Sequence, residues 1–121
     1  MSLPNTGYAK PPIVVATPDA ALAPMLHGYS ATVLAGGHTH APFVRRYKGA
    51  VFLNPGSVGF AHEVTDVGIQ HPPWAEYAIV AWRAGRLTIE LRRVPVDAEL
   101  VVRALLRSDM PHADWLASRW R

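Results

Sequence analysis

Two histidines one residue apart, His38 and His40, are the residues of this chain whose types and spacing point most directly to chemistry. In extended backbone, residues two apart point to the same side of the chain, roughly 6.5 Å from one another. Two imidazoles so placed can hold one metal ion, or reach two ions roughly 3.5–4 Å apart. Gly36 and Gly37 precede them and permit positive φ angles and close backbone approach. The pattern is therefore compatible with a metal-binding loop.

Taken alone, a His-x-His pair is a weak signal. A zinc or manganese site needs at least three protein ligands. The remaining candidates are four other histidines and nine carboxylates, and none of them stands at a recognisable ligand spacing. By itself, the pair leaves open both metal binding and an exposed surface position without a binding role.

The elements that must position this loop follow from turn and periodicity signals. A short apolar run at 13–16 is expected to form a strand. Threonine, proline and aspartate at 17–19 predict the start of a helix, with the threonine hydroxyl as its cap, and Gly28 ends it. Pro24 inside that helix is expected to kink it or divide it into two short turns. The apolar run 31–35 then predicts a buried strand that delivers the histidines at its C-terminal end.

Two β-hairpins are predicted after the histidine pair. The first joins 43–47 to 50–53, and the second joins 77–82 to 87–94. Strand 77–82 is apolar on both faces, which is typical of a central strand. Strand 87–94 alternates apolar and polar residues, so one of its faces should be solvated.

Two helices are predicted to close the chain. Asp97 can cap the first, whose apolar residues recur at helical spacing. Pro111 can open the second, which carries Trp115, Leu116 and Trp120 as packing residues.

Composition bounds the class of protein. The chain has 121 residues, of which 50% are hydrophobic and 17% charged, so it is expected to form one globular domain. It contains no cysteine, which excludes disulfides and thiolate catalysis. The net charge of +3 is too small to favour nucleic acid as a partner. No apolar run is long enough to span a membrane and no signal peptide is recognisable, so a soluble, cytoplasmic protein is expected.

The run GHTH at 37–40, followed by a hairpin and the run NPGSVG at 54–59, resembles the C-terminal signature of calcineurin-like metallophosphoesterases. The similarity is greatest to small bacterial and archaeal phosphodiesterases of that superfamily. It implies an α/β fold, the αββα sandwich of two β-sheets flanked by helices, here mostly hairpins plus two C-terminal helices. It also implies a hydrolase of phosphate mono- or diesters, in which a hydroxide bridging two divalent ions attacks phosphorus.

Carried over from the resemblance, His38 and His40 would each bind one ion of a dinuclear site. The family leaves the metal open among manganese, iron, zinc, nickel and magnesium. Arg45 and Arg46 on the adjacent hairpin could steer a phosphate, with ordinary surface charge as the alternative, and His62 is a further site candidate. The Asn-Pro-Gly-Ser stretch lacks the Gly-Lys-Ser/Thr of a P-loop and is expected to brace the histidines as a tight turn. The supporting residues expected are Gly36, Gly37, Thr39, Asn54, Gly56 and Ser57.

The upstream part of the family's pattern has no counterpart in this chain. An Asp-x-His, a second aspartate, an Asn-His pair and a further histidine should precede the Gly-His-x-His motif. Residues 1–121 are therefore expected to form the C-terminal half of a phosphoesterase domain, with an irregular segment at 1–12. A fragment of a longer protein is favoured; half of a split enzyme and a stand-alone protein without the reaction are the alternatives.

A half-domain has consequences for activity and partners. Hydrolysis of a phosphate ester by this chain alone is not expected, because only two ligands remain. The alternative function is a non-catalytic scaffold or protein-binding module. Half of a sandwich should also expose apolar sheet surface and unpaired strand edges, so self-association or docking of the missing N-terminal half is expected.

Overall fold

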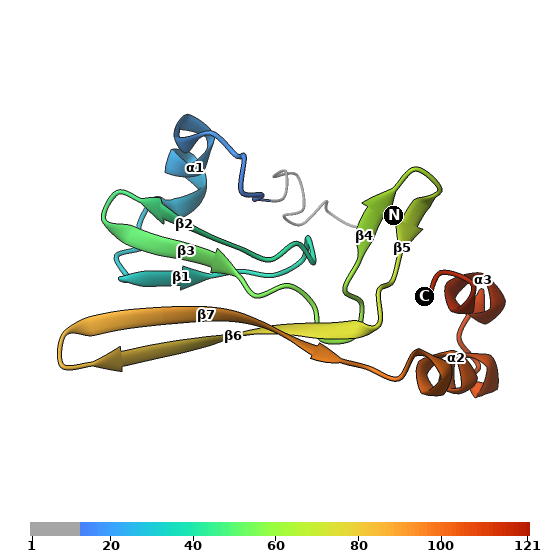
Figure 1. The fold of residues 1–121 in the computed structure, drawn as a ribbon. Helices are drawn as coiled ribbons and strands as arrows, with labels where there is room; N and C mark the ends of the chain where they lie inside the picture. The colour runs from blue at the N-terminus through green and yellow to red at the C-terminus, as the bar shows by residue number, and fades with distance from the viewer. Residues whose placement is uncertain (1–12) are drawn as a thin grey trace.

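The computed structural model describes residues 13–121, and the predicted segment at 1–12 lies outside the described residues. These residues form three small sheets and three helices, which confirms the predicted α/β class with hairpins and two closing helices (Figure 1). In chain order the elements are α1 (Asp19–Leu26), β1 (Val33–Ala35), β2 (Phe43–Tyr47), β3 (Ala50–Asn54), β4 (Glu63–Thr65), β5 (Gly68–Gln70), β6 (Trp74–Arg83), β7 (Arg86–Pro95), α2 (Ala98–Arg107) and α3 (Ala113–Ala117).

The sheet that carries the histidines has the strand order β1-β3-β2. β2 and β3 form the predicted hairpin through Lys48 and Gly49, both of which have positive φ. β1 runs parallel to β3, with Ala35 opposite Leu53, so both strands end at the same edge of the sheet. Figure 1 shows α1 on one side of this sheet and the β6–β7 pair on the other. The buried residues here are Leu22, Phe43, Tyr47, Phe52 and Leu53.

The chain before α1 departs from the prediction. The expected strand at 13–16 is absent, and the backbone turns there, with the Thr17 N–H donating to Val14 O at 3.0 Å. The Thr17 hydroxyl accepts from Val14 N instead of capping the helix. α1 also runs unbroken through Pro24, because a proline near the end of so short a helix removes a single backbone hydrogen bond. Gly28, with φ of 88°, follows the helix end as predicted.

The second predicted hairpin is present and longer than expected. β6 and β7 pair antiparallel over ten residues each, around a turn at Ala84 and Gly85. Among residues 13–121, β6 pairs with β7 alone, so the predicted central position of β6 is wrong for this part of the chain. Its apolar residues are instead partly exposed, with Val80 at 46% and Trp82 at 59%.

A third hairpin, β4–β5, was not predicted. Each strand has three residues, too few for an alternating pattern to stand out. Val64 and Ile69 lie opposite each other in it, and both are exposed.

The closing helices largely follow the sequence. Asp97 caps α2, accepting hydrogen bonds from the backbone N–H groups of Glu99 and Leu100. α3 begins after His112, not at Pro111, and Trp120 lies beyond the helix, where it pairs with His71. Leu105, Ala117 and Trp120 form the small core between the two helices. No helix within residues 13–121 is long and apolar enough to cross a membrane.

Candidate metal-binding site

The two loops singled out in the sequence lie next to each other because β1 and β3 are parallel neighbours. The histidine loop, residues 36–40, begins where β1 ends, and the proline-glycine loop, residues 55–59, begins where β3 ends. The Gly36 N–H donates to Leu53 O at 3.0 Å and continues the pairing beyond β1. One sheet edge thus places both loops at one site.

Asn54 joins the two loops. It is buried, with 1% of its surface exposed. Its Nδ2 group donates to Thr39 Oγ1 at 2.9 Å and lies 3.4 Å from Gly37 O, while its Oδ1 accepts from Gly56 N at 2.9 Å. A buried amide must find partners for both its donor and its acceptor groups. Asn54 finds them in the loops on either side of it.

The backbone of the histidine loop is not extended. His38 has φ of 82° and His40 has φ of 56°, so both lie in the left-handed region. The predicted same-side arrangement, which assumed extended backbone, is therefore wrong. The loop turns tightly after Gly36 and Gly37, and this turn sets the direction of each imidazole. Such conformations cost about 1–3 kcal/mol at non-glycine residues and are concentrated at functional sites.

His40 is held by one ring nitrogen. Its Nδ1 lies 2.8 Å from Phe60 O. A carbonyl oxygen only accepts, so Nδ1 carries a proton, and in the neutral imidazole Nε2 keeps its lone pair. Metal-binding histidines are held in this way, with one ring N–H donating to a carbonyl and the other nitrogen facing the ion.

His62 lies beside His40. Their ring centroids are 5.7 Å apart with the planes tilted by 44°. Two imidazoles bound to one ion through bonds of about 2.0–2.1 Å have centroids roughly 5 Å apart, so this pair is close to that spacing. His38 is exposed on the loop. The structure therefore brings together His40 and His62.

The donor set is incomplete for the dinuclear site that the resemblance implies. Across residues 13–121, no group of three or more His, Cys, Asp or Glu side chains is arranged to hold a metal ion.

The two arginines proposed to steer phosphate have different surroundings. Arg45 binds the start of α1, pairing with Asp19 and donating to the carbonyl oxygens of Val15 and Thr17. Arg46 is exposed on β2. Of the two, Arg46 is the one with an exposed side chain.

Two arginines that the sequence did not single out line a cleft beside the proline-glycine loop. Arg92 and Arg93 of β7 line a cleft of about 230 Å³ together with Pro42 and Pro55. Arg93 Nε donates to buried Glu76 at 3.0 Å. The side-chain hydrogen bond with Glu90 raises the pKa of Arg92, so this group stays charged. Only the packing of β7 against the loops reveals these arginines.

The other histidines have structural or surface positions. His71 is buried, with Nδ1 3.0 Å from Ala61 O, and packs against Phe60 and Trp120. His27 and His112 are exposed at the ends of helices. The sequence assigned His71 no role, and its buried contacts give it one in packing.

Residues 15–73, just under half of the chain, match the family model described as the calcineurin-like phosphoesterase superfamily domain. The match includes both loops. Residues 15–73 are therefore similar to the calcineurin-like phosphoesterase superfamily domain. No relative was found among curated proteins.

Among solved structures, this chain is similar to Vacuolar Protein Sorting 29 from Cryptosporidium parvum. The identity is 20% and the TM-score 0.33. The similarity covers 63% of this chain and 44% of that chain, so the chain spans less than half the length of that protein.

Proposed function

We propose that this chain supplies the histidine loop of a metal-dependent phosphoesterase that acts on phosphate mono- or diesters. In this proposal His40 binds a divalent ion through Nε2, and His38 and His62 are the further ligand candidates. The incomplete donor set means that hydrolysis requires ligands from outside the described residues, whether from preceding sequence or from another chain.

One observation carries the proposal. The hydrogen bond between His40 Nδ1 and Phe60 O fixes the tautomer with a free Nε2, on a loop that buried Asn54 holds in a strained conformation. Left-handed backbone at non-glycine residues is concentrated at functional sites, which supports a binding role for this loop. The match of residues 15–73 to the calcineurin-like phosphoesterase superfamily domain supports the reaction class.

Equilibrium dialysis against manganese tests the metal ligand. The wild-type chain should bind manganese weakly, and His40→Ala should weaken the binding further, by at least about tenfold, because it removes one imidazole of the His40–His62 pair. His27→Ala is the matched control, since it removes an exposed imidazole at the end of α1 and should leave binding unchanged. Equal manganese binding by His40→Ala and wild type would contradict the proposal.

Hydrolysis is measured on the same samples with bis-p-nitrophenyl phosphate. The chain alone should stay at the background rate. The same assay is then repeated with the polypeptide that carries the missing metal ligands, either as preceding sequence or as another chain. A rate that rises in its presence, and is lost in His40→Ala, would support the phosphoesterase proposal.

A second candidate function is a non-catalytic protein-binding module. It is favoured by the absence of a third metal-binding side chain within residues 13–121. Under this candidate, His40→Ala would leave partner binding intact and manganese would have no effect on it.

A further inference from the structure

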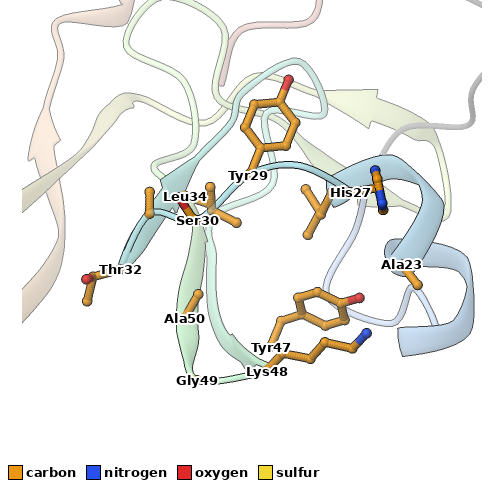
Figure 2. A pocket seen from close by; sticks show the side chains of 12 residues that line it. Ala23, His27, Tyr29, Ser30, Thr32, Leu34, Tyr47, Lys48, Gly49 and Ala50 are labelled. Atoms are coloured by element: carbon orange, nitrogen blue, oxygen red, sulfur yellow. The ribbon is translucent and has the colours of Figure 1, made fainter.

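A cavity of about 420 Å³ lies at the other end of the sheet from the histidine loop. It is formed by the end of α1, the segment that leads into β1, and the β2–β3 turn (Figure 2). The histidine loop follows β1 and Asn54 ends β3, whereas this cavity is lined by Thr32 and Ala50, at the starts of the same strands. Its volume is in the range of about 300–1,000 Å³ typical of small-molecule sites.

The polar groups that line the cavity are mostly hydrogen-bond donors. They include the ammonium of Lys48, the hydroxyls of Ser30, Thr32 and Tyr47, and the imidazole of His27, and no carboxylate lines the cavity. Figure 2 shows the Tyr47 hydroxyl and the Lys48 ammonium extending side by side toward α1. Tyr47 is buried with 7% of its surface exposed, so its ring is a fixed wall of the site.

The surrounding segment is also poor in negative charge. Residues 13–54 contain one carboxylate, Asp19, and it is paired with Arg45. Within the described residues, Lys48 forms no ion pair, and its recorded partner is the Tyr47 ring, 5.4 Å from Nζ. An unpaired cation beside several hydroxyls favours an anion.

The cavity also has an apolar side. Leu26 and Leu34 line it, and the exposed Tyr29 ring stands at its rim. A site that combines donors with apolar and aromatic groups suits a ligand with a charged group and a flat, weakly polar body.

We propose that this cavity is a second ligand site, separate from the histidine loop, that binds a small organic phosphate of mononucleotide size. Lys48 and the Tyr47 hydroxyl bind the phosphate, and the apolar wall with Tyr29 contacts the body of the ligand. The proposal does not rest on the proposed function of the histidine loop.

Titration of the full chain with AMP, followed by backbone amide NMR, tests the site. AMP should shift the amides of the segments around the cavity, 26–34 and 47–50, and leave those of residues 36–40 in place. Adenosine, which lacks the phosphate, should bind at least about tenfold more weakly, a difference of one ionic contact. Inorganic phosphate should compete with AMP only weakly, because it lacks the body of the ligand.

Variants of Lys48 identify the group that binds the phosphate. Lys48 has φ of 44°, a conformation that glycine adopts readily, so Lys48→Gly removes the ammonium without disturbing the turn. It should weaken AMP binding about tenfold, and Lys48→Arg should restore most of the affinity. Arg46→Ala is the matched control, since it removes a cation of the same hairpin that does not line the cavity, and it should change AMP affinity less than twofold.

Three results would overturn the proposal. They are no binding of AMP up to about 10 mM, equal affinity of Lys48→Gly and wild type, and amide shifts confined to residues 36–40. The same titration on His40→Ala should give the wild-type AMP affinity, so failure at this cavity and failure at the histidine loop are distinguishable.

Discussion

The histidine loop depends on the neutral tautomer of His40 and on the amide of Asn54. The carbonyl of Phe60 fixes the His40 tautomer, and the Asn54 amide has hydrogen-bond partners in both loops. Neither interaction requires a metal ion. The loop is therefore preorganised. An ion would bind to an imidazole that is already fixed in place, and would not have to order a flexible side chain.

Asn54→Ala should destabilise the protein by about 2–3 kcal/mol, because it leaves the buried groups that Asn54 satisfies without partners. Chemical denaturation followed by tryptophan fluorescence measures the change. Thr39→Val removes one of these hydrogen bonds and should cost about 1 kcal/mol. In the Asn54→Ala background Thr39→Val should cost almost nothing, since the two residues share that bond. Additive losses would show that Asn54 does not clamp the histidine loop.

At the residue scale, the sequence predicts which residues gather at the site better than how the backbone orients their side chains. The motif spacing predicts His38, His40 and Asn54 in one region, and the structure shows that the parallel pairing of β1 and β3 brings their loops to one edge. The sequence also offers His62 as a site candidate, and this residue lies beside His40. The sequence does not give the left-handed backbone at the histidines, which depends on the turn after Gly37. Whether these side chains bind metal stays a prediction.

At the scale of elements, the proline-glycine loop connects the histidine-bearing sheet to β6. The Glu76 N–H donates to Ser57 O at 2.9 Å, and the Glu76 side chain packs directly against Gly56. A Cβ on Gly56 would lie 2.4 Å from Glu76 Oε2 and 2.7 Å from Glu76 Cβ, and Gly56 has φ of 88°. Only glycine fits this position.

Gly56→Ala should therefore destabilise the protein by about 3 kcal/mol, from left-handed strain and overlap with a buried side chain. Gly59→Ala, in the same loop, is the matched control, because nothing lies within 4 Å of its added Cβ and its φ is not positive. Its effect should stay within about 0.5 kcal/mol. Thermal unfolding of both variants compares them, and equal stability of the two would contradict the described contact.

The elements that the sequence predicts well have strong local signals. The β2–β3 turn, the β6–β7 hairpin and the Asp97 cap are of this kind. The prediction of a strand at 13–16 was wrong because a segment of strand composition needs a neighbouring strand to pair with. None pairs with it among the described residues. The β4–β5 hairpin was not predicted because its exposed apolar residues give no clear alternation of apolar and polar positions.

At the scale of the whole molecule, the described residues leave long strand edges open. β6 and β7 pair only with each other there, and Val80 and Trp82 are partly exposed on β6. Such an edge is a template for another chain. We propose that this surface is covered by a second copy of the chain or by the remainder of a phosphoesterase domain.

Self-association should therefore be measurable by sedimentation velocity, with the average mass rising as concentration increases. Val80→Lys places a charge on β6 and should shift the distribution toward monomer. Leu100→Lys is the matched control, since it changes an exposed apolar residue of α2, far along the chain from β6, and should leave the distribution unchanged. A stable monomer at every concentration would contradict this proposal.

The most direct test of metal binding by His40 is long-range ¹H–¹⁵N NMR of its imidazole, with and without zinc. We expect the tautomer with the proton on Nδ1, as the Phe60 hydrogen bond requires, and a large shift of Nε2 when zinc is added. A proton on Nε2, or an Nε2 resonance that zinc leaves unchanged, would show that His40 is not a metal ligand.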